Sequence, residues 1–193
     1  MQHNNSLNTI IRSRRSVKPE QYNTTPIAES IILEMLENAR WAPTHARTEP
    51  WRFVVCTGDG LKRFAEYQAE QYKLHTPAES FNANKYDKLK TTPLKASHII
   101  LVGMKRQETE KLPIEEEIAA VACAVQNMLL TATANGIGAY WSTGGITYHQ
   151  AMKNYMGLGE NDKALGMIYI GNYDIELPEG VRSGIEDKVR WEQ

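Results

Sequence analysis

Hydrophobic positions along the chain switch repeatedly between helical spacing and short strand-like runs. Helical spacing is clearest after Thr25, a candidate N-cap, and Pro26, which would sit in the first turn. Short runs of β-branched and aromatic residues indicate strands. The pattern predicts helices over residues 7–12, 26–39, 61–72, 80–90, 114–135 and 147–155, and strands over residues 51–57, 98–104, 139–143 and 164–173. Strands interleaved with long helices predict an α+β fold with a central mixed β-sheet flanked by helices.

Three segments stand out from this pattern. Residues 118–134 are apolar nearly all round, so this stretch must lie in the middle of the subunit or at an interface. Two copies packed across a two-fold axis would give a homodimer, and burial within one subunit is the alternative. Residues 74–93 are polar and predicted to be mobile. The tail from 175 to 193 has no strong period and is expected to extend onto a partner subunit. The first helix is expected to bury Ile10 and Ile11.

Composition narrows the class of protein. With 193 residues, a hydrophobic share of 41% and a net charge of −1, we expect one domain over residues 1–193 that binds neither nucleic acid nor membrane. The first residues lack the features of a signal peptide and no apolar run approaches the length of a membrane span, so we expect a cytoplasmic protein. Cys56 and Cys123 lie in apolar runs outside any CxxC or Cys/His pair. They are predicted to be core residues, with no disulfide and no metal site.

A basic segment follows the first predicted helix. Residues 12–18 contain four cations and two hydroxyls, with Arg14, Arg15 and Ser16 at the centre. Arginine donates paired, charge-assisted hydrogen bonds to phosphate oxygens, so the segment is suited to one phosphate group. A solvated basic turn is the alternative. The chain has no GxGxxG and no GxxxxGK[ST] motif, so the common dinucleotide and P-loop cradles are absent.

Two further segments carry polar residues among aromatic or small ones. Prolines fix the loop over residues 41–53, where His45 and Glu49 can hydrogen-bond the edge of a heteroaromatic ligand. A rigid connector with Trp51 in the core is the alternative. Small residues over 136–145 let a flat ligand lie on the backbone, and main-chain N–H groups after Ser142 can point at it. A tight turn at the end of a strand is the alternative.

Taken together, the three segments are specific. In their order and separations the chain resembles the FMN-dependent nitroreductase family over nearly its whole length, especially short members with an Arg-Arg-Ser start. The matching pieces are Arg14-Arg15-Ser16, then Ala42-Pro43-x-His45-x-x-x-Glu49-Pro50-Trp51-x-Phe53, and then Gly136-x-Gly138-x-x-Trp141-x-x-Gly144.

The resemblance implies where FMN binds. Arg14, Arg15 and Ser16 fall on the positions that hold the phosphate and ribityl chain, with Lys18 near the ring. The loop with His45 usually reaches the flavin of the neighbouring subunit, and Glu49 would join it there. Three residues match the segment that lines the cofactor from the opposite side: Trp141, Ser142 and Thr143.

Other positions follow the resemblance more loosely. Gly144 or Gly145 would offer a main-chain N–H to flavin N5, and Arg182 in the tail would add a phosphate contact. Many relatives carry Gln where this chain has Glu49, and longer relatives often carry Asn at the place of Arg47. A cation at the pyrimidine edge would favour the anionic reduced flavin and raise its potential.

The implied activity is hydride transfer from NAD(P)H through the flavin to a small electron-poor acceptor, nitroaromatic or quinone-like, with ping-pong turnover. The flavin carries the redox step, so no catalytic side chain is assigned. Two alternatives remain at this point. One is a flavin-binding carrier or sensor with little turnover. The other is a relative that uses flavin for dehalogenation or flavin breakdown, for which residues 74–93 are the only candidate lid. A nucleic-acid module built on residues 12–18 is disfavoured by the net charge.

Overall fold

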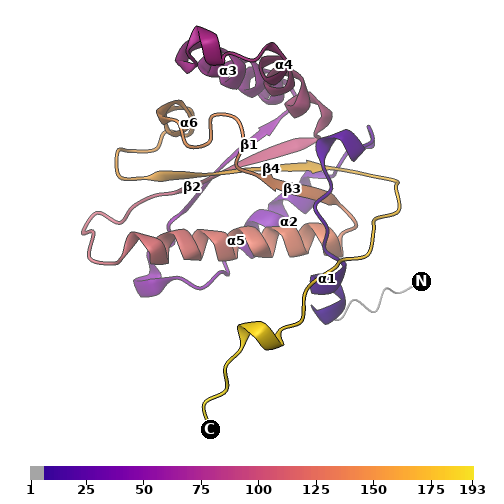
Figure 1. Ribbon diagram of the computed structural model, residues 1–193, viewed down its shortest axis with the longest axis vertical. Helices are drawn as coiled ribbons and strands as arrows, with labels where there is room; N and C mark the ends of the chain where they lie inside the picture. The colour runs from indigo at the N-terminus through magenta and orange to yellow at the C-terminus, as the bar shows by residue number, and fades with distance from the viewer. Residues whose placement is uncertain (1–6) are drawn as a thin grey trace.

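A four-stranded sheet lies between two layers of helices in the computed structural model, which describes residues 7–193 (Figure 1). Helices α2 and α5 cover one face, and α3, α4 and α6 lie over the other. Helix α1 packs against α5. The bounds are α1 Leu7–Ser13, α2 Glu29–Ala39, α3 Asp59–His75, α4 Ala83–Thr91, α5 Ile114–Ala134, α6 Gln150–Met156, β1 Trp51–Thr57, β2 His98–Met104, β3 Gly138–Ser142 and β4 Lys163–Gly171. The architecture is therefore α+β, as predicted.

The sheet is antiparallel throughout, so the prediction of a mixed sheet is wrong. The strand order is β1-β2-β4-β3, and each neighbouring pair among the described residues runs antiparallel. The single crossover helix α5 does make β2 and β3 point the same way. Strand β4, however, lies between them, so no parallel pair forms. After β1, helices α3 and α4 bring the chain back to the same end of the sheet. Strand β2 therefore starts beside the last residue of β1 and runs antiparallel to it.

Strand β2 is buried along its entire length because helices cover both faces of the sheet. Its side chains alternate between two cores, as the pleat of a strand requires. Ile99 and Leu101 join the core under α3 and α6, whereas Ile100 and Val102 join the core under α2 and α5. This two-sided burial explains the continuous apolar run in the sequence.

Local hydrogen bonds explain two of the helix starts that differ from the prediction. Helix α2 begins at Glu29 rather than at Pro26, because the carbonyls of Thr25 and Pro26 accept from the Asn172 side chain (3.0 and 3.1 Å) instead of from helical N–H groups. Helix α6 begins at Gln150 rather than at Thr147. The Thr147 hydroxyl is used in the preceding turn, and His149 is the N-cap.

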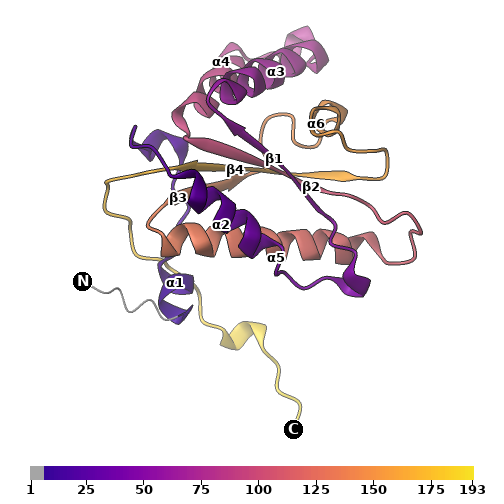
Figure 2. The same cartoon turned by 180° about the vertical axis from the view of Figure 1, so that it is seen from behind.

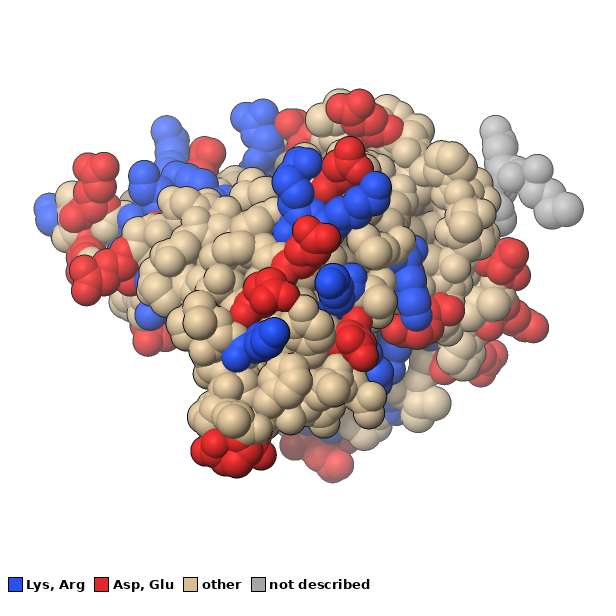
Figure 3. Space-filling view, turned by 90° about the horizontal axis from the view of Figure 1, so that it is seen from above, with Lys and Arg blue, Asp and Glu red and all other residues tan. Residues whose placement is uncertain are grey.

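The polar segment over residues 74–93 contains α4, which confirms the helix predicted over residues 80–90, and short 3₁₀ turns flank it at Ala78–Ser80 and Thr92–Lys95. The side chain of Asn82 caps α4, accepting from a main-chain N–H at 3.0 Å. The Phe81 ring stacks on Tyr72 with 5.7 Å between centroids, and the Lys85 ammonium lies over the same ring. Seen from above, this face carries acidic and basic side chains interspersed (Figure 3).

Helix α5 is long and apolar enough to cross a membrane by length and composition, but half of its most apolar stretch is buried as a core helix. Viewed from behind, it runs beneath the whole sheet beside α2 (Figure 2). Its outer face stays exposed and carries Cys123, which was predicted to lie in the core. The short α1 contains no buried residue, so Ile10 and Ile11 are not buried within this one chain either. Both observations leave an apolar surface on this side of the subunit.

Candidate functional site

Four arginines converge on one cavity of about 440 Å³, which we call the basic cavity. It lies where α1, the segment after it, α5 and the C-terminal tail meet. Its lining residues are Ile11, Arg12, Arg14, Arg15, Gln126, Gly180 and Arg182. The structure thus brings together the basic segment of the sequence and the distant Arg182.

The arginines of this cavity are engaged differently. Arg15 is fixed by main-chain carbonyls, at 2.8 Å from Pro178 O, 2.6 Å from Arg12 O and 3.0 Å from Arg14 O. Arg12 and Arg14 form no side-chain hydrogen bond or ion pair within residues 7–193, and Arg182 donates only to the carbonyl of its neighbour Val181. Three guanidinium groups are therefore free to bind an anion, while the fourth organises the backbone.

The tail passes directly over Arg15. A Cβ placed on Gly180 would lie 2.7 Å from Arg15 Cζ, so a side chain there would displace the guanidinium. Beyond this contact the tail leaves the body of the subunit (Figure 1), with Val181 84% and Trp191 83% exposed. The cavity thus depends on a tail segment that has little other support within one chain.

The basic segment continues along the open edge of the sheet. The buried Val17 donates its N–H to Ala139 O of β3 at 3.1 Å. Ser16 and Lys18 on either side of it are exposed, and neither lines the basic cavity. Two of the three segments singled out in the sequence, the first and the third, are therefore in contact.

A bulge in β4 fixes Trp141 of that third segment. Its indole N–H donates to Leu165 O at 3.0 Å, where the pairing of β2 with β4 shifts register. Gly166 follows with φ of +116°, a conformation open only to glycine, and a Cβ there would lie 2.5 Å from Ser142 O. The indole stays 36% exposed at the end of the strand, so it can line a ligand site.

The turn after β3 is packed too closely to admit a side chain. Gly145 has φ of +66°, and a Cβ there would lie 2.9 Å from Gln68 Oε1 and 3.1 Å from Leu89 Cδ2. Gln68 is fully buried. Its amide donates to Leu89 O at 2.7 Å, while its Oε1 has no hydrogen-bond partner within the described chain. Helices α3 and α4 therefore set the position of this turn, and Thr143 and Gly144 remain exposed on its outer side.

The loop over residues 44–49 is held in a strained conformation. Ala46, Arg47 and Glu49 have φ of 49°, 56° and 43°, in the left-handed region that non-glycine residues rarely adopt. Side-chain hydrogen bonds support the loop. The Thr44 hydroxyl bonds to the Thr48 hydroxyl (3.0 Å) and accepts from the Glu49 N–H (3.2 Å).

His45 connects this loop to the first turn of α5, because its Nδ1 lies 2.5 Å from Glu116 Oε2. The basic cavity meets the same helix ten residues later, at Gln126. Ten residues of α-helix rise by roughly 15 Å, so the loop and the basic cavity lie at different places along α5. Neither His45 nor Glu49 lines the basic cavity of its own chain.

Two tyrosines, the half-buried Tyr22 and the buried Tyr169, support strands β3 and β4. Tyr22 packs so closely under Gly171 that a Cβ there would lie 2.3 Å from its ring, and its hydroxyl donates to Tyr169 O at 2.9 Å. Burial raises the pKa of both Tyr22 and Tyr169 well above the ordinary value. Both phenols therefore stay neutral, and they act here as packing and hydrogen-bonding groups.

Three residues of this arrangement were missed in the sequence: Gln126, Gln68 and Glu116. Arg12 belongs to the basic segment that the sequence analysis singled out. The three missed residues lie at ordinary positions of helices, and only the packing of α3 and α5 shows that they face the site.

Several known proteins are similar to this chain in sequence and in fold. The model of the nitroreductase family matches residues 11–172. The "Putative NAD(P)H nitroreductase YfhC" of Bacillus subtilis (strain 168) is 33% identical over 174 residues, covering 90% of this chain and 87% of that protein. YdjA of Escherichia coli (strain K12), named in the same way, is 34% identical over 140 residues, covering 72% of this chain and 74% of its own.

Solved structures agree. A nitroreductase-like family protein from Bacillus cereus has a TM-score of 0.84 at 25% identity, covering 99% of this chain and 98% of its own. A Desulfovibrio desulfuricans protein, described as a "putative nitroreductase in complex with fmn", has a TM-score of 0.74 at 25% identity, with 98% of both chains covered. With the fold, the basic cavity and these matches together, the chain belongs to the nitroreductase family.

Proposed function

We propose that this protein is an FMN-dependent oxidoreductase that transfers a hydride from NAD(P)H through the flavin to a small electron-poor acceptor, nitroaromatic or quinone-like, by a ping-pong mechanism. The observation that carries the proposal is the basic cavity, where three arginines that form no ion pair within residues 7–193 face one space between α1, α5 and the tail. The relatives named NAD(P)H nitroreductases and the FMN complex of a structural neighbour support the donor and the cofactor.

In this proposal Arg14, Arg12 and Arg182 bind the FMN phosphate, and Arg15 fixes the tail that presents Arg182. Ser16 extends this contact toward the ribityl chain, since it borders the cavity-lining Arg15 in sequence. When bound, FMN supplies the group that accepts and releases the hydride.

The residues around the ring position it and shape the space beside it. Trp141, fixed by the bulge, would line one side of the ring, together with Ser142 and Thr143. The packed turn at Gly145 would present its main chain to the ring, because Gln68 holds it from behind. These contacts bind and orient, so the proposal needs no side chain that donates or removes a proton.

The loop contribution requires a homodimer. The outer face of α5 carries Ala119, Cys123 and Gln126, all exposed in one chain. If two such faces pack antiparallel about a two-fold axis, the first turn of one α5 lies beside later turns of the other. His45 and Glu49 would then reach the basic cavity of the partner subunit. The basic cavity of their own chain lies roughly 15 Å away from them along α5. The homodimer and a cytoplasmic location remain predictions.

A binding experiment tests the cofactor site. We expect Arg14→Ala and Arg182→Ala each to weaken FMN by about tenfold or more, because each removes a charge-assisted hydrogen bond worth about 1.5–3 kcal/mol. Riboflavin, which lacks the phosphate, should bind the variants and the wild type alike. Arg40→Ala is the matched control, since Arg40 lies on the surface in an ion pair with Glu37. Equal binding of FMN and riboflavin by the wild type would refute the phosphate assignment.

A second experiment tests turnover and separates the enzyme from a flavin carrier. Under nitrogen, NADPH should bleach the flavin absorbance of the holoprotein within one mixing time, and a quinone should restore it. Double-reciprocal plots at several donor concentrations should be parallel. A protein that binds FMN but keeps its absorbance with both NADH and NADPH would be a carrier or sensor.

A further inference from the structure

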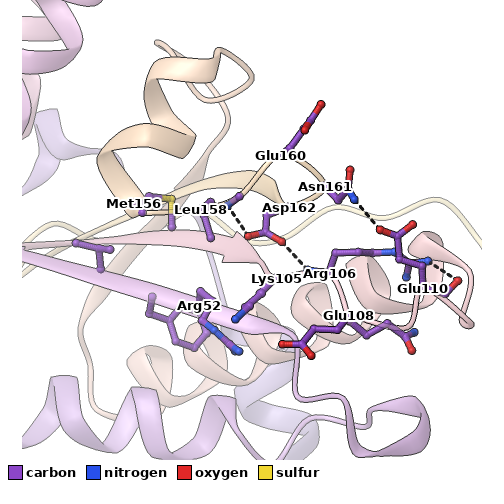
Figure 4. Close-up of a pocket in the computed structure, with 15 residues that line it drawn as sticks. Arg52, Lys105, Arg106, Glu108, Glu110, Met156, Leu158, Glu160, Asn161 and Asp162 are labelled. Atoms are coloured by element: carbon purple, nitrogen blue, oxygen red, sulfur yellow. Dashed lines mark hydrogen bonds between the residues drawn. The ribbon is translucent and has the colours of Figure 1, made fainter.

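A second cavity of about 710 Å³ lies at the end of the sheet where β1 and β4 begin and β2 ends (Figure 4). The start of β1, the segment after β2 and the loop between α6 and β4 surround it. None of its lining residues lines the basic cavity, so it is a separate site.

Two cations of this cavity are not neutralised. Lys105 is exposed, and its ammonium pairs with no acid within residues 7–193. Within the described part of the chain the Arg52 guanidinium donates only to main-chain carbonyls, at 3.0 Å to Glu49 O and 2.7 Å to Trp51 O. The third cation, Arg106, is already paired with the buried Glu117. Lys105 and Arg52 therefore remain to bind an anion.

An apolar wall lies next to these cations. Met156 and Leu158 pack so closely on β2 that a Cβ on Gly103 would lie 3.0 Å from Met156 Cε and 2.9 Å from Leu158 Cδ1. Val54 of β1, which is half-buried and packs on the same core as Met156 and Leu158, adds further apolar surface. A ligand anchored by its charge can thus bury an apolar body against the sheet.

The acidic residues of the cavity favour a ligand with one negative charge over a ligand with two. Asp162 accepts from the N–H groups of Arg106 (2.8 Å) and Gly159 (2.7 Å), and Glu110 accepts from Asn161 (2.6 Å). In Figure 4 the Glu160 side chain points away from the other labelled residues. Glu108 is exposed and forms no ion pair within the described chain, so it would repel a dianion more than a monoanion.

We propose that this second cavity binds a small monocarboxylate with an apolar, ring-sized body, of the benzoate class. Its carboxylate contacts Lys105 and Arg52, and its ring packs on Met156 and Leu158. Since Arg52 also holds the Glu49 carbonyl, the ligand contacts a residue that supports the strained loop.

Methyl NMR of the purified protein labelled at methionine tests this site, with the Met156 signal assigned through Met156→Leu. Benzoate should shift that signal saturably. Benzamide, which lacks the charge, and phenyl phosphate, a dianion, should each bind at least about tenfold more weakly. If benzamide binds as well as benzoate, the cations play no part. If phenyl phosphate binds as tightly, the monocarboxylate assignment is wrong. No saturable shift with benzoate overturns the site.

Variants locate the charge that is used. Lys105→Met should weaken benzoate at least about tenfold, and Glu108→Gln should tighten it by about twofold or more. Lys111→Met is the matched control, because Lys111 is exposed in the same segment but does not line the cavity. Amide spectra of each variant check its fold, and Arg52→Gln serves if Lys105→Met is perturbed. Unchanged affinity in both cation variants refutes the proposal.

Discussion

The buried ion pair between Arg106 and Glu117 anchors the segment between β2 and α5. The two side chains are 10% and 1% exposed. Arg106 also donates to the carbonyls of Glu110 and Leu112, and the second oxygen of Glu117 accepts from the Gln107 N–H at 3.1 Å. Because water cannot replace the missing partner, neutralising one member leaves a buried, unpaired charge.

Breaking such a pair from one side costs about 3–5 kcal/mol. Glu117→Gln keeps the shape of the side chain and an acceptor for the Gln107 N–H, so we expect the lower end, about 3 kcal/mol. This change lowers the ratio of folded to unfolded protein by roughly 150-fold. With an m-value of about 2–3 kcal/mol/M in urea, the unfolding midpoint should fall by about 1–1.5 M.

The double variant tests whether the loss comes from the unpaired charge. Arg106→Met with Glu117→Leu removes both charges, so it should cost less than the two single changes together, with a coupling energy of about 2 kcal/mol or more. Glu116→Gln is the matched control. It lies in the same turn of α5 but is exposed, and it should change the free energy of unfolding by no more than about 1 kcal/mol. If Glu117→Gln matches this control, the pair does not stabilise the fold.

Three further changes have definite expected outcomes. Gly166→Ala places a Cβ 2.5 Å from Ser142 O and should cost about 3 kcal/mol or more by urea unfolding, whereas Gly136→Ala, with open space around it, should cost about 1 kcal/mol; equal losses would contradict the steric argument. Burial lowers the pKa of His98 below 6.5, so its contribution to stability is present above pH 6.5 and lost as the pH falls below that value. His98→Asn should therefore lose less stability than the wild type between pH 7 and pH 5, and parallel pH profiles would count against this. Asn82→Ala removes the α4 cap and should lower stability by about 0.5–2 kcal/mol, and an unchanged thermal midpoint would show that the cap is dispensable.

The sequence predicts strands β1 and β2 to the residue, because an apolar run bounded by proline, glycine or polar residues leaves little choice of where the strand ends. It does not predict the order of the strands. That order depends on β4 entering between β2 and β3, a contact between distant segments that local patterning does not encode.

The candidate site divides in the same way. Motifs located the basic segment and the turn at Gly145 without showing what holds them. Gln68 behind the turn and Gln126 in the basic cavity act through position alone, since nothing in their neighbours' chemistry distinguishes them. The predicted N-cap of α6 was also wrong. The Thr147 hydroxyl donates to Gly144 O in the preceding turn, so it does not cap the helix.

The left-handed residues Ala46, Arg47 and Glu49 have a consequence for engineering. None is glycine, so the isolated peptide would relax to other conformations, at a gain of about 1–3 kcal/mol for each residue released. A graft of residues 44–49 onto another scaffold would therefore lose its shape unless an equivalent of the Glu116 carboxylate and the Arg52 guanidinium came with it.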